Sequence, residues 1–251
     1  MPSARYLATD MTGWPLTRDG VVAAGIFGIG CVAAGWQWVV VLLAFFVSAT
    51  LLSHAGADRK RAKLEAITAK GNARDARQVL ANGAVFGAAA IGSIIAPSTA
   101  WTVLGAAAIA ASAADTWATE IGTLTSFNPR SILTLREVPP GTSGGITVPG
   151  MLAAVAGAVF IAAFAAFAGW PSEAGYAAIV GGLTGATVDS LLGAGLQSKR
   201  WCSQCGMETE RTIHICGTET ILAGGIAWLD NDGVNAISSL AGAATGALFL
   251  L

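Results

Sequence analysis

The chain is poor in charge, in histidine and in cysteine. Only 12% of its 251 residues are charged, two are histidines and four are cysteines, whereas 54% are hydrophobic and the mean hydropathy is +0.62. This balance lies well outside that of a soluble domain. The formal net charge of −1 also supplies no basic field for nucleic acid. A soluble enzyme and a nucleic-acid-binding protein are therefore excluded.

Long apolar runs recur along the sequence, each bounded by polar or charged residues. A helix needs about 20 mostly apolar residues to cross a hydrocarbon core of roughly 30 Å. The runs that predict membrane helices are 20–35, 36–53, 79–96, 100–122, 149–169, 174–197 and 230–251. We therefore predict an all-α, polytopic bundle of about seven transmembrane helices that forms a single integral membrane domain over residues 1–251.

The basic residues are concentrated in alternate loops. Twelve of the 14 Lys and Arg residues lie in the predicted loops 54–78, 123–148 and 198–229, and none lies in the short connections near Pro97 and Trp170. Loops of this kind face the cytoplasm in membrane proteins. The pattern predicts three cytoplasmic loops and an N-terminus on the outside. We expect a multi-pass protein of a prokaryotic-type cell membrane whose active face is cytoplasmic.

Carboxylates recur near the predicted cytoplasmic ends of three helices. The acidic set is Asp115, Glu120, Asp189, Asp230 and Asp232. An Asp at the bilayer centre costs about 2.5–3.5 kcal/mol on insertion scales, so such residues usually pair, face water or bind a ligand. Asp115 and Asp189 lie too far inside their helices to cap them. Helix capping remains the alternative for Asp230 and Asp232.

The loop 123–148 ends in small residues whose backbone N–H groups can approach an anion closely. This run is Gly141, Thr142, Ser143, Gly144 and Gly145, and Ser131 and Arg136 precede it in the same loop. It is not a Walker A sequence, and a turn that re-enters the bilayer is the alternative explanation for the glycines. The preferred interpretation is a phosphate-binding loop.

Other polar side chains continue from the loops onto helix faces. Those before and within the third predicted helix are Lys70, Arg74, Gln78 and Asn82, and those near the ends of the last two are Gln197, Asn231 and Asn235. Spacings of three and four residues place such side chains on one face of a helix. Alternatively, the basic residues of the loops only set the membrane topology beside lipid headgroups. For the basic residues within 59–63 this alternative is preferred.

Carboxylates beside basic and glycine-rich loops at a membrane boundary indicate Mg²⁺-assisted chemistry on a phosphate. Mg²⁺ prefers oxygen ligands and binds through a few carboxylates together with substrate phosphates. The predicted ligands are the five acids of the acidic set, of which Asp115, Glu120, Asp189 and Asp232 are also the predicted catalytic residues. The polar side chains and the glycine loop are the predicted nucleotide- and phosphate-binding residues.

A second metal site is predicted in the loop 198–229. Cys202 and Cys205 form a Cys-x-x-Cys pair, and His214 and Cys216 follow. Disulfides are disfavoured in a cytoplasmic loop. Four soft ligands predict a structural Zn²⁺ that holds the loop together and has no open coordination position. A set of unliganded thiols is the alternative.

Four ordered motifs carry a resemblance to a known family. They are residues 70–83, Ala114-Asp115-Thr116-Trp117 to Gly122, Val138-Pro139-Pro140 to Gly145, and Leu229-Asp230-Asn231-Asp232 to Asn235. Over roughly residues 15–250 the chain resembles the integral membrane family, domain of unknown function 92, that includes vertebrate transmembrane protein 19 and plant phytyl-phosphate kinase. The resemblance implies Mg²⁺-dependent transfer of a phosphoryl group from a nucleoside triphosphate, expected to be CTP, to an isoprenoid monophosphate such as phytyl phosphate.

A function of another class is left open by the same residues. Intramembrane acids and broken helices also occur in transporters and flippases, which bind an ion or a phosphorylated lipid. Against that alternative, the polar residues gather at one side of the membrane rather than at its midplane. The expected partners are a nucleoside triphosphate, an isoprenoid monophosphate and the lipid bilayer, with no nucleic acid and with a homo-oligomer left open.

Overall fold

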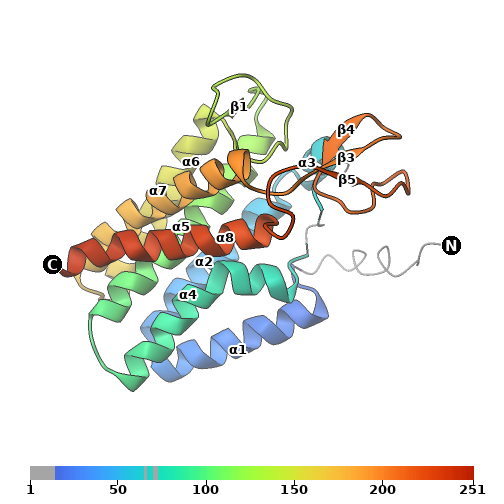
Figure 1. Cartoon of the computed structure of the whole chain (residues 1–251). Coiled ribbons are helices and arrows are strands. Elements are labelled where there is room, and N and C mark those ends of the chain that lie inside the picture. The colour runs from blue at the N-terminus through green and yellow to red at the C-terminus, as the bar shows by residue number, and fades with distance from the viewer. Residues whose placement is uncertain (1–14, 65–66, 70–72) are drawn as a thin grey trace.

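The computed structural model describes residues 15–64, 67–69 and 73–251, and this part of the chain is mostly helical (Figure 1). The long helices are α1 (Arg18–Ala34), α2 (Trp36–His54), α4 (Ala76–Ile95), α5 (Ala100–Leu124), α6 (Val148–Phe167), α7 (Ser172–Gly195) and α8 (Asn231–Gly246). Each of the seven predicted helical ranges coincides with one of them. An eighth, short helix, α3 (Ala57–Leu64), lies in a segment that the sequence predicts only as a loop.

Five helices of the described chain are long and apolar enough to cross a membrane. They are α2, α4, α6, α7, and α8 with its 3₁₀ extension η1 (Ala247–Leu250). The two other long helices are α1, which has only 17 residues, and α5, whose apolar sequence is interrupted by Asp115, Glu120 and several threonines. The expectation of about seven spans is thus supported by length and composition for five of them.

Helix α5 is the central helix of the bundle and contacts α2, α4, α6, α7 and α8. Its stretch 106–111 is completely buried and consists of alanines and one isoleucine. Small residues on the neighbours match it, since a Cβ added at Gly185 of α7 would lie 2.3 Å from the Cβ of Ala111. Close approach of this kind is the usual way in which membrane helices associate. It brings the polar ends of α5, α7 and α8 to one place.

Side-chain caps hold the starts of several helices. Asp75 and Gln78 form a capping box at α4, with the Gln78 N–H donating to Asp75 at 2.9 Å. Thr147 caps α6, and Asp230 caps α8 by accepting from the N–H of Gly233 at 3.0 Å. Such caps satisfy N–H groups that have no partner within the helix. The capping alternative considered for Asp230 is therefore correct, whereas the cap of α8 does not include Asp232.

The all-α prediction is wrong for the loops, which form two small antiparallel sheets. The first pairs β1 (Arg130–Ser131) with β2 (Gly145–Ile146). The second has the order β4-β3-β5 and comprises β3 (Lys199–Cys202), β4 (Met207–Thr209) and β5 (Ile221–Gly224). Strands of two to four residues are too short to show a period-two pattern, so periodicity gives no signal for them. Pairing across turns and longer loops creates them.

Candidate functional site

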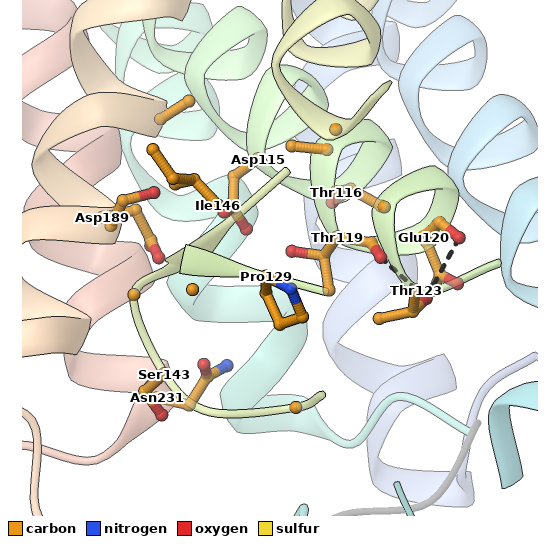
Figure 2. Close-up of a pocket in the computed structure, with 18 of the residues that line it drawn as sticks. Asp115, Thr116, Thr119, Glu120, Thr123, Pro129, Ser143, Ile146, Asp189 and Asn231 are labelled. Carbon is orange, nitrogen blue, oxygen red and sulfur yellow. Dashed lines mark hydrogen bonds between the residues drawn. The ribbon is translucent and has the colours of Figure 1, made fainter. Parts of the chain in front are cut away.

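A cavity of about 1090 Å³ lies where α4, α6 and α8 begin and α5 and α7 end (Figure 2). Charged residues from all parts of the fold line it: Lys60, Arg74, Asp115, Glu120, Asp189, Glu210, Arg211, Asp230 and Asp232. Small-molecule sites commonly measure about 300–1,000 Å³. The cavity is therefore large enough for a polar ligand together with part of a second one.

The structure brings nearly all of the predicted site residues to this cavity. All five acids line it, and so do Arg74, Gln78, Asn82, Gly141, Thr142, Ser143, Gly144, Gly145, Gln197, Asn231 and Asn235. Ser131 and Arg136 are not among the lining residues. Ser131 lies in β1, where its N–H donates to the carbonyl of Arg136 at 2.9 Å, and Arg136 is exposed. Lys70 lies outside the described residues.

Asp115 and Asp189 face each other across the interface of α5 and α7. They lie close enough for their charges to act on each other, and Figure 2 shows them on neighbouring helices. The hydroxyl of Ser238 on α8 donates to Asp189 at 3.2 Å. Two carboxylates close together repel each other unless they share a proton or bind a cation. This pair therefore has the character of a cation site.

Glu120 has a different environment, because it pairs with Lys60 of α3. The Lys60 side chain is buried, and its ammonium also donates to the carbonyl of Leu52 at 2.5 Å. The interpretation of residues 59–63 as topology determinants is thus wrong for Lys60, which forms part of the cavity wall. A run of five mostly basic residues gives no periodicity that would single out one of them. Only the packing of α3 identifies Lys60.

The acids at the start of α8 pair with Arg77 of α4. The guanidinium lies 3.0 Å from Asp230 and 3.8 Å from Asp232. Arg77 is largely exposed and Asp230 is partly exposed, whereas Asp232 is only 6% exposed. Asp230 thus has both a capping role and an ion pair, and Asp232 is the acid of the two that lies deeper in the wall of the cavity.

The glycine loop, residues Gly141–Gly145, packs against the last turn of α7. Gly141 and Gly144 have φ values of +88° and +75°, which favour glycine. A Cβ at Gly144 would also lie 2.4 Å from the backbone nitrogen of Ala194. The loop can therefore follow α7 closely only with glycine at this position, and it forms one wall of the cavity beside Asp189.

Glu210, which follows β4, was missed by the sequence analysis. Its Oε1 accepts hydrogen bonds from the hydroxyl of Ser143 at 2.8 Å and from the amide of Gln197 at 2.7 Å. Burial raises the pKa of Glu210 above its ordinary value. No local motif surrounds this residue, so only the tertiary structure reveals that it ties the glycine loop to the end of α7.

The predicted zinc ligands Cys202, Cys205, His214 and Cys216 gather at the second sheet. One ligand atom from each lies within 4.8 Å of all the others. The sulfurs of Cys202 and Cys216 are 3.6 Å apart, and Nδ1 of His214 is 3.2 Å from Cys216. Hydrogen bonding to Thr218 and His214 lowers the pKa of Cys216 to about 6. The cluster could bind a metal such as zinc, which prefers thiolate and imidazole ligands.

The helical bundle, its candidate membrane spans and its polar cavity define a multi-pass integral membrane protein. The chain belongs to the family described as integral membrane protein DUF92, which matches residues 7–243. The predicted family resemblance is thereby confirmed.

Three relatives align over most of the chain. The uncharacterized membrane protein MJ0933 of Methanocaldococcus jannaschii is 34% identical over 73% of this chain and 76% of its own. Protein PGR of Arabidopsis thaliana is 30% identical over 82% and 79%, respectively. The uncharacterized membrane protein sll0875 of Synechocystis is 28% identical over 91% and 80%. No solved structure matches the chain.

Proposed function

We propose that the protein is a membrane-embedded isoprenoid monophosphate kinase. It transfers the γ-phosphoryl group of a nucleoside triphosphate, with CTP as the expected donor, to a phytyl- or prenyl-type monophosphate. The observation that carries the proposal is the meeting of the Asp115–Asp189 pair with the glycine loop in one large cavity. Cation ligands and close backbone N–H donors are the two elements that bind a polyphosphate.

The partners of the acids narrow the predicted Mg²⁺ ligands. Glu120 is neutralised by Lys60, and Asp230 caps α8 and pairs with Arg77. Asp115 and Asp189 have no ion pair with a basic side chain among the described residues. These two acids, with Asp232 nearby in the cavity wall, therefore fit Mg²⁺ best. The bound ion supplies charge neutralisation for the donor phosphates.

Arg74 and the glycine loop are the proposed phosphate-binding elements. Burial lowers the pKa of Arg74 and the charge of Glu120 opposes this shift, but an arginine stays protonated at neutral pH. A guanidinium with limited access to water interacts strongly with phosphate oxygens. Backbone N–H groups of the loop add donors that do not change with pH.

The reaction needs positioning more than acid–base catalysis. An oxygen of the acceptor monophosphate forms a bond to the γ-phosphorus while the bond from that phosphorus to its bridging oxygen breaks. The products are the prenyl diphosphate and a nucleoside diphosphate. Since the acceptor phosphate is already ionised, no general base is required, and catalysis rests on alignment and charge stabilisation.

The apolar part of the cavity wall suits the tail of such an acceptor. It includes Met151 and Val155 of α6 and Leu183 of α7, and the first two are at least 43% exposed. A lipid could therefore keep its hydrocarbon chain in the bilayer while its phosphate reaches the acids. The predicted cytoplasmic orientation of the basic loops would give the same cavity access to nucleotides.

The direct test uses purified protein in detergent with each γ-labelled nucleoside triphosphate and phytyl or geranylgeranyl monophosphate. We expect labelled prenyl diphosphate with CTP and Mg²⁺, and none when Mg²⁺ is chelated. Glu173→Gln is a matched control, because Glu173 is an exposed acid in the first turn of the helix that carries Asp189. Absence of product with every donor, from protein shown to be folded, would refute the kinase and favour a transporter or flippase.

A further inference from the structure

The second sheet and its connecting loops, residues 199–224, form a module with almost no apolar core. Its buried residues are Cys202, Thr209, His214 and Thr220, and only Cys202 among them is hydrophobic. Trp201, Ile213, Ile215, Ile221 and Leu222 are all exposed. Segments this small usually need a disulfide or a metal to hold one structure, because they bury too little apolar surface. Hydrophobic burial therefore does not explain how this module is held.

The module contains four ligands whose placement fits a tetrahedral metal. Cys202 lies at the end of β3, Cys205 in the turn to β4, and His214 and Cys216 in the connection to β5. All four ligand atoms fall within 4.8 Å of one another, although 14 residues separate the first ligand from the last. Nδ1 of His214 lies 3.2 Å from Sγ of Cys216, and the buried Nε2 of the same ring has no hydrogen-bond partner in the described part of the chain.

The same module carries the residue that reaches the cavity. Glu210 directly follows β4, whose Met207 is paired in register with Cys202. The carboxylate of Glu210 then accepts from Ser143 of the glycine loop and from Gln197 after α7. The β3–β4 pair and Glu210 thus connect the ligand cluster to the glycine loop.

We propose that Cys202, Cys205, His214 and Cys216 bind one Zn²⁺, and that this metal holds the module in the shape that presents Glu210 to the glycine loop. Four protein ligands leave no open coordination position, so the metal is structural. Glu210 is a positioning residue, since it acts on the loop through Ser143. Zinc binding and the positioning of the glycine loop do not depend on the proposed kinase activity.

Metal content tests whether the four residues bind zinc. Elemental analysis of protein purified without chelator should give about one zinc per chain, and Cys205→Ser and Cys216→Ser should each lose it. Both cysteines are exposed, so these variants remove a ligand without opening a cavity in the bundle. Cys31→Ala, at a cysteine of α1 outside the cluster, should keep its zinc. A wild type without zinc, or cluster variants that keep it, would overturn the site.

Hydrogen exchange measured by mass spectrometry tests, without any substrate, whether the metal and Glu210 position the glycine loop. Removal of zinc should speed exchange severalfold in a peptide spanning the glycine loop, and should leave peptides from the middle of α6 unchanged. Glu210→Ala should produce the same loop effect while retaining zinc. Glu210→Gln, which keeps an oxygen to accept from Ser143, should largely restore protection. Loop exchange that ignores both zinc removal and Glu210→Ala would show that the module does not position the loop.

Discussion

Two parts of the cavity wall carry acids in opposite electrostatic situations. At the interface of α5 and α7, Asp115 and Asp189 lie close enough for their charges to repel each other, whereas Glu120 and Asp230 form ion pairs with Lys60 and Arg77. A carboxylate that already has a cationic partner contributes little to binding a further cation, while two adjoining carboxylates are stabilised by one. The comparison separates acids that fit a metal from acids that hold the cavity together, although all of them look alike in the sequence.

The largest expected effect comes from removing one charge of the Asp115–Asp189 pair. Asp115→Asn or Asp189→Asn should lower phosphoryl transfer by at least about 100-fold, because metal-dependent charge stabilisation contributes several kcal/mol to such reactions. Each substitution also removes a like-charge contact, so the melting temperature in detergent should not fall. Transfer rates at saturating Mg²⁺ provide the measurement. Normal activity in both variants would refute the metal assignment.

Gly144→Ala should have the next largest effect on nucleotide binding. The added methyl group meets the α7 backbone at 2.4 Å and the backbone has a positive φ, so the loop must move away from the helix. We expect an increase of roughly tenfold or more in the KM for the nucleotide.

Gly169→Ala is the control that separates the effect of moving the glycine loop from the effect of backbone strain alone. Gly169 has a similar φ of +76°, but open space surrounds it in the connection of α6 and α7. Alanine at positive φ costs on the order of 1 kcal/mol, so both variants should lose some stability. Only Gly144→Ala should change the KM. Equal KM values in the two variants would contradict a role of the loop in binding.

Glu120→Gln should act mainly on stability. It leaves the ammonium of Lys60 buried without its anionic partner, and breaking a fully buried pair in this way costs about 3–5 kcal/mol. Because Glu120 is partly exposed, we expect a smaller loss, seen as a lower melting temperature in detergent. The double variant Glu120→Gln with Lys60→Met should recover most of the loss. If Glu120→Gln melts like the wild type, the pair is not structural.

Arg77→Gln should have the smallest effect. Its shorter ion pair, with Asp230, is exposed, and exposed pairs are worth below about 1 kcal/mol, while its contact with Asp232 is longer at 3.8 Å. The capping bond of Asp230 to Gly233 also survives the substitution. The melting temperature should therefore stay within one or two degrees of the wild type. A loss as large as that of Glu120→Gln would remove the distinction between the two ion pairs.

The sequence by itself predicted the helices and most of the cavity. The thickness of a bilayer sets the length of apolar sequence that a spanning helix needs. Runs of that length can therefore be located in a single sequence. The clustering of Asp115, Asp189 and the glycine loop was also predictable, because alternate helix ends meet at the same side of a bundle. The exposed position of Arg136 was not, since residues within one loop can point to either side of it.

Only the tertiary structure decided which charges neutralise one another and which remain for a ligand. Arg77 and Asp230 are 153 residues apart in sequence, and Ser143 and Glu210 are 67 apart. Neither contact leaves a local pattern, because each depends on the packing of elements that are distant along the chain. Hydrophobic periodicity determines where helices form and which ends are polar. The partner of Lys60 is determined by the packing of α3 against α5, and the partners of Glu210 by the position of the second sheet beside the glycine loop and the end of α7.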